Sequence, residues 1–122
     1  MADQDVADAL RRSFLGKLPR DVVEELVAGG HRSEYPAGST IYREGAAPRA
    51  ELVVRGLLRV YMTSPEGRQV TVRYAREAEV LGIAVIVGGP ANVSVQTLAD
   101  SSLFSLDARR LTAAARRDGR VA

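Results

Sequence analysis

The sequence predicts a mainly β domain, a sandwich or barrel, with helices before and after the strands. Short runs rich in Val, Ile, Leu and Tyr fill residues 32–106. Glycine or proline interrupts these runs about every 8 to 12 residues, which favours an all-β sandwich or barrel over alternating strand–helix units. Outside this stretch, apolar residues follow helical spacing instead. We therefore expect one domain over residues 1–122, with helices in 1–31, strands in 32–106 and a helix in 107–122.

The N-terminal helices follow from the spacing of apolar residues. These residues recur at helical intervals between Val6 and Phe14. A second helix is expected over Arg20–Ala28, because the glycine pair Gly29-Gly30 is a typical stop signal. The apolar stripe of this second helix contains Val22, Val23, Leu26 and Val27.

A β-hairpin is the clearest local prediction. Its strands are expected over Leu57–Met62 and Gln69–Tyr74, joined by a turn that contains Pro65 and Gly67. Side chains on successive strand residues point to opposite faces. The alternation in the second strand therefore predicts a buried face of Val70, Val72 and Tyr74 and a wetter face of Thr71 and Arg73.

Further strands are expected over Val93–Leu98 and Leu103–Leu106. The segment Leu81–Val87 fits a strand or a helical turn equally, because periodicity does not separate the two over so short a run. Asp107 is predicted to be the N-cap of a helix over Ala108–Arg117, because its side chain suits the first free backbone amides.

The composition excludes several kinds of chemistry. The 122 residues contain no cysteine and one histidine, His31. Thiol catalysis, disulfides, iron–sulfur clusters and cysteine-built zinc sites are therefore excluded, as is a metal site with several histidines. His31 would also have to be the base of any serine triad. We expect no enzyme activity, no cofactor and no metal.

Nothing in the sequence indicates export or a membrane span. The first ten residues contain three aspartates and lack the basic and apolar regions of a signal peptide. The most apolar stretch, Val80–Val87, is far too short to cross a bilayer. We expect a cytoplasmic protein with no membrane partner.

Short motifs occur in a set order between Pro36 and Gly82, and the resemblance that they carry covers about residues 14–117. They are Pro36–Gly45, Leu52–Gly56, Arg59–Tyr61, Glu66–Arg68 and Val80–Gly82. In this order and spacing they resemble the cyclic-nucleotide-binding domain of the Crp/Fnr family of transcription regulators. The resemblance implies a double-stranded β-helix, or jelly roll, with flanking helices. Glycine suits its corners because it accepts positive φ without strain.

The resemblance also implies a ligand pocket. Cyclic-nucleotide binders carry a Gly-Glu pair, whose glutamate takes the ribose hydroxyl, and a later arginine that holds the cyclic phosphate. Here Gly82 is present, Ile83 stands at the glutamate position, and Ala91 and Asn92 replace the arginine and its small partner. We therefore expect poor binding of cyclic AMP and cyclic GMP, and a site that holds an apolar or unidentified effector or is packed core. The candidate lining is Val72, Ala75, Leu81, Gly82, Ile83, Ala84, Ala91, Asn92 and Val93.

The function implied by the resemblance is effector sensing in a Crp/Fnr-like transcription regulator. In that family a long dimerisation helix and a helix-turn-helix follow the sensor, and residues 118–122 fall where the dimerisation helix would begin. We therefore expect DNA binding through a segment that is not in this chain, and a homodimer in the full-length protein. One alternative is a regulatory domain attached to an enzyme or transporter. A second, a small cupin-like enzyme, is disfavoured by the single histidine.

Overall fold

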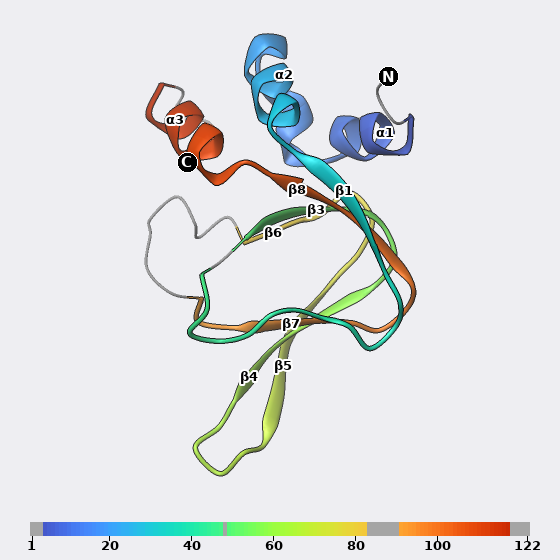
Figure 1. Ribbon diagram of the computed structural model, residues 1–122, viewed down its shortest axis with the longest axis vertical. Helices are drawn as coiled ribbons and strands as arrows, with labels where there is room; N and C mark the ends of the chain where they lie inside the picture. The colour runs from blue at the N-terminus through green and yellow to red at the C-terminus, as the bar shows by residue number, and fades with distance from the viewer. Residues whose placement is uncertain (1–3, 48, 83–90, 118–122) are drawn as a thin grey trace.

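The computed structural model describes residues 4–47, 49–82 and 91–117 (Figure 1). Helices α1 (Gln4–Arg12) and α2 (Arg20–Ala28), with the short 3-10 helix η1 (Phe14–Lys17) between them, precede the strands, and α3 (Ala108–Arg117) follows them. The strands are β1 (His31–Tyr35), β2 (Thr40–Tyr42), β3 (Ala50–Arg55), β4 (Leu58–Thr63), β5 (Gln69–Ala75), β6 (Val80–Leu81), β7 (Ser94–Thr97) and β8 (Ser101–Leu106).

The strands form two four-stranded sheets, in the orders β1-β8-β3-β6 and β2-β7-β4-β5. Every strand pair among the described residues is antiparallel. Figure 1 shows the three helices over the outer side of the first sheet, with the second sheet on its other side. The predicted fold class is therefore confirmed: a mainly β jelly roll with helices at both ends.

The core has two parts, and β3 contributes to both because its side chains alternate. Leu52 and Val54 pack against the helices, together with Leu10 of α1 and Leu26 of α2. Val53 points to the opposite side of β3, between the two sheets. The other buried residues between the sheets are Ile41, Tyr42, Leu58, Val60, Ala75, Leu81, Val95 and Leu103.

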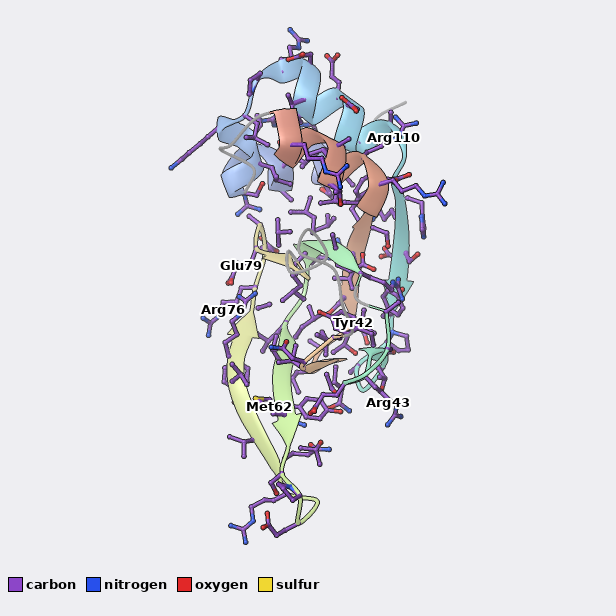
Figure 2. The ribbon with its side chains drawn as sticks, turned by 90° about the vertical axis from the view of Figure 1, so that its left-hand side faces the viewer. Tyr42, Arg43, Met62, Arg76, Glu79 and Arg110 are labelled. Atoms are coloured by element: carbon purple, nitrogen blue, oxygen red, sulfur yellow. The ribbon has the colours of Figure 1, made fainter. Side chains whose placement is uncertain are left out.

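Helix α3 begins as its sequence predicts. Asp107 Oδ1 accepts hydrogen bonds from the backbone amides of Arg109 and Arg110, at 2.9 and 3.1 Å. The Arg110 side chain, labelled in Figure 2, donates to the backbone carbonyl of Glu25 at 3.4 Å. The cap therefore fixes where α3 starts, and Arg110 ties α3 to the last turn of α2.

The hairpin lies where it was predicted, as β4 and β5, but its buried face was predicted wrongly. Val70, Val72 and Tyr74 are 54, 53 and 49 % exposed. The hairpin projects beyond the rest of the roll, so no other element of the described chain covers its outer half (Figure 1). Side chains enter the core from the inner half of the hairpin, where Leu58 pairs with Ala75 and Val60 is also buried.

Two further predictions concern segment ends. Phe14 lies in η1 rather than in the first helix, because α1 ends at Arg12 and the Ser13 hydroxyl accepts a hydrogen bond from the backbone amide of Leu15. In the ambiguous Leu81–Val87 segment, Leu81 ends strand β6, and the residues from Ile83 onward lie outside the described part of the chain.

Candidate functional site

A hollow of about 250 Å³ lies between the base of the hairpin and the strands beside it. Strands β2, β4, β5 and β6 contribute to its walls, as do two short stretches that follow β6 and precede β7. The described residues that line it are Tyr42, Val60, Val72, Arg73, Val80, Leu81, Gly82, Ala91, Asn92 and Val93. Most of this lining is apolar, and Arg73 is the only charged residue in it.

Most of the predicted candidate lining is brought together here. Val72, Leu81, Gly82, Ala91, Asn92 and Val93 all line the hollow. Ala75 does not, because it is fully buried between the sheets at the base of the hairpin. Ile83 and Ala84 lie outside the described residues.

Arg73 is the most consequential residue that the sequence prediction missed. It was placed on the wetter face of its strand, opposite to Val72. In the structure Val60 pairs with Arg73 and Tyr61 pairs with Thr71, which leaves Val72 as an extra residue in β5. Such a bulge sets two residues of one strand against one of its neighbour and re-aims their side chains. Val72 and Arg73 consequently both line the hollow.

The Arg73 guanidinium is held by a neighbouring carboxylate. Its Nη1 lies 3.0 Å from Oε2 of Glu79, whose other oxygen accepts a hydrogen bond from the backbone amide of Arg76 at 3.1 Å. Figure 2 shows Glu79 and Arg76 close together on the edge of the molecule at β5. Glu79 does not line the hollow. The ion pair with Glu79 therefore orients the Arg73 side chain, which remains part of the lining of the hollow.

Tyr42 of β2, labelled in Figure 2, is one of the lining residues of the hollow. Burial raises the pKa of Tyr42, the nearby charge of Arg73 partly offsets this, and the carboxylate of Glu51 raises it again. The phenol therefore stays protonated at neutral pH and keeps its O–H donor.

An ion pair with one fully buried partner lies near Tyr42. Glu51 is completely buried, and its Oε1 lies 2.7 Å from Nη2 of Arg49. The Ser105 hydroxyl also donates to the Glu51 carboxylate, while Arg49 donates to the hydroxyl of Tyr35 at 3.2 Å. Burial alone would lower the pKa of Arg49, but Tyr35 and Glu51 together raise it. Because each charge has partners, the group forms a satisfied polar network inside the roll.

The backbone conformation and close packing at position 82 require a glycine. Its φ is +75°, a conformation that L side chains rarely adopt, and an added Cβ would lie 1.9 Å from the carbonyl oxygen of Arg49. The backbone leaving β6 therefore passes directly against the start of β3. Only glycine fits there without displacing one of the two strands.

Three other hollows, of about 310, 320 and 430 Å³, lie on the described part of the chain, and His31 lines the last of them. The structure places no group of three or more His, Cys, Asp or Glu side chains where they would share a metal ion. His31 is exposed at the start of β1 and does not line the hollow at the base of the hairpin. Among the described helices, none has the length and apolar character needed to cross a membrane.

Comparison with known proteins agrees with this architecture. The family described as the cyclic nucleotide-binding domain matches residues 32–118, and the chain therefore belongs to that family. No curated protein matches the sequence. The resemblance predicted from the glycine motifs is thus confirmed.

Solved structures of bacterial proteins share the fold. The N-terminal domain of a transcriptional regulator from Streptomyces coelicolor is 26 % identical, with a TM-score of 0.75, over 93 % of this chain and 84 % of that one. The sensor domain of the transcriptional regulator DNR from Pseudomonas aeruginosa is 16 % identical, with a TM-score of 0.85, over 97 % and 81 %. A candidate cyclic nucleotide binding protein from Ruegeria pomeroyi is 20 % identical, with a TM-score of 0.88, over 99 % and 55 %. This chain thus spans about half the length of that last protein.

Proposed function

We propose that the chain is the effector-sensing domain of a Crp/Fnr-like transcription regulator, and that it does not bind cyclic AMP in the family's usual way. The observation that carries the proposal is the mostly apolar hollow, to which the described residues contribute a single charge, from β5. The family membership and the sensor domains among the structural neighbours support the sensing role.

The weak binding of cyclic nucleotides follows from the two replaced anchors. Ile83 and Ala91 stand where the family resemblance places the glutamate and the arginine. A charge-assisted hydrogen bond contributes about 1.5–3 kcal/mol, which is roughly ten- to hundredfold in affinity. Loss of both anchors makes a cyclic nucleotide a poor ligand.

Calorimetric titration of the chain with cyclic AMP and cyclic GMP tests this part of the proposal. We expect no saturable binding in the micromolar range for either nucleotide. Stoichiometric binding at micromolar concentration would contradict it.

The remaining parts of the proposal concern the longer protein. DNA binding is assigned to a helix-turn-helix and homodimerisation to a long helix, both outside this chain, and the location is the cytoplasm. The coding sequence that follows codon 122 tests this directly. A helix-turn-helix there is the expected result, whereas a catalytic or transmembrane domain would overturn the assignment to a transcription regulator.

A second candidate function is regulation of an attached enzyme. The regulatory domain of Toxoplasma gondii PKA, solved with cAMP, is 18 % identical to the chain, with a TM-score of 0.83. The same fold therefore also serves in kinase regulation. A kinase-type or other enzymatic partner encoded next to the chain would favour this candidate over transcription control.

A further inference from the structure

We propose that the hollow binds a small carboxylate with an apolar body, and that Arg73 is its anion-binding residue. This inference rests on the proposed effector-sensing function and adds the chemical class of the effector. It is carried by the bulge in β5, by the ion pair that holds Arg73 and by the apolar walls around it.

The bulge supplies a cation at a position that regular alternation would turn away from the hollow. Val72 is the extra residue of β5, and both it and Arg73 line the hollow together with Tyr42 of β2. The Glu79 carboxylate accepts a hydrogen bond from one guanidinium nitrogen of Arg73, at 3.0 Å. Glu79 itself does not line the hollow. The structure assigns the other nitrogens no partner among the described residues, which leaves N–H donors for a carboxylate.

The polar groups of the lining suit one negative charge. Arg73 is the only charged residue among the described residues of the lining, where Tyr42 and Asn92 are neutral polar residues. An ion buried among apolar side chains needs a partner for each of its charges. Arg73 supplies one positive charge, which Glu79 already shares at 3.0 Å, so a monoanion suits the hollow better than a doubly charged phosphate.

The apolar walls and the volume of the hollow determine what the uncharged part of the ligand can be. Among the apolar lining residues, Leu81 and Val60 are buried and Val72 is half-exposed. An apolar body would cover Val72 and remove it from water. Pockets for drug-sized ligands enclose roughly 300–1,000 Å³, so a hollow of about 250 Å³ fits a smaller molecule.

Calorimetric titration with phenylacetate tests the inference, with phenylacetamide as the uncharged molecule of the same shape. We expect saturable one-to-one binding of phenylacetate, with affinity at least tenfold above that of phenylacetamide. Inorganic phosphate is the third probe and should not saturate. Absence of saturable phenylacetate binding, or equal affinity for the amide or for phosphate, would overturn the inference.

Two substitutions locate the binding site. Arg73→Gln should lower the affinity for phenylacetate by roughly ten- to hundredfold. Arg68→Gln removes the same charge from the hairpin turn, away from the hollow, and should leave the affinity within twofold. Arg73→Lys keeps the charge but loses the fork of donors, so an intermediate affinity is expected. Equal losses for the Gln variants at 68 and 73, or no loss at 73, would overturn the role of Arg73.

Two control measurements distinguish a misfolded variant, and a failure of the proposed sensing function, from a failure of the carboxylate assignment. Thermal melting of each variant shows whether it is folded, and Arg73→Lys replaces Arg73→Gln as the deciding variant where the latter melts early. Titration with cyclic AMP on the same samples tests the proposed function. Tight binding of cyclic AMP contradicts that function, whereas failure of phenylacetate alone contradicts only the carboxylate assignment.

Discussion

The two sheets of the roll differ in what covers them. The sheet β1-β8-β3-β6 is packed by helices on its outer side and by the second sheet on its inner side. The sheet β2-β7-β4-β5 is covered at the base of its hairpin, while the outer half of that hairpin projects into solvent (Figure 1). The hollow lies where this cover ends. The covered sheet thus holds the core that packs against the helices, and the partly covered sheet supplies much of the lining of the hollow.

The largest expected effect compares one apolar residue from each region. Leu52→Ala opens a cavity under the helices, where Leu52 is fully buried, and should lower the free energy of unfolding by about 2–5 kcal/mol. Val70→Ala on the exposed hairpin should change it by less than about 0.5 kcal/mol. Urea denaturation of both variants measures the difference. Similar losses at the two positions would mean that the hairpin face is covered in solution.

The ion pair between Arg49 and Glu51 gives the next effect. Arg49→Met leaves the fully buried Glu51 carboxylate without its cation. Breaking a buried pair in this way costs about 3–5 kcal/mol, and because Arg49 is 41 % exposed we expect a value near the lower end.

The double variant Arg49→Met/Glu51→Leu is the control for this prediction. It removes both charges and should recover most of the stability, measured by the same denaturation. If the double variant is less stable than Arg49→Met, the carboxylate stabilises the roll through Ser105 rather than depending on the arginine.

A smaller gain is expected at the turn that joins the hairpin to the covered sheet. Ala78 has φ +69°, the only positive φ of a non-glycine residue in the described chain. Its amide donates to the carbonyl of Val53 at 2.8 Å, so the turn is held in this conformation. Ala78→Gly relieves the strain and should stabilise the fold by about 1 kcal/mol, visible as a higher melting temperature. A lower melting temperature would show that the conformation costs Ala78 nothing.

The smallest effect is a pH dependence at Tyr42. Its pKa is raised in the folded chain above the ordinary value of 10.0, so the folded state binds the proton more tightly than the unfolded state. Stability is therefore fully present below pH 10 and falls as the pH rises from there through the folded pKa. Denaturation above and below pH 10 should show a steeper loss for the natural chain than for Tyr42→Phe. Equal slopes would contradict the burial of this hydroxyl.

Local signals in the sequence predicted much of the fold. Gly38, Gly45, Gly56 and Gly67 all have positive φ, which is why glycine marked the turns so clearly. Asp107 marked the start of α3 because its capping bonds involve residues two and three positions away.

The missed features depend on neighbours that are distant in sequence. The exposure of Val70 and Val72 was missed because alternation indicates two faces and does not show whether another element covers them. Arg73 was missed because the bulge that turns it toward the hollow arises from its pairing with β4. Glu51 carried one usable signal, a lone charge in an apolar run, but its partner Ser105 lies on another strand.

The most direct test of the account restores the two replaced anchors. The chain and its variant Ile83→Glu/Ala91→Arg are titrated with cyclic AMP under the same conditions. We predict no saturable micromolar binding for the chain, and at least tenfold tighter binding for the variant, because the phosphate regains its arginine and the ribose its carboxylate. Micromolar binding by the unaltered chain would contradict the central claim that this member of the family senses a different ligand.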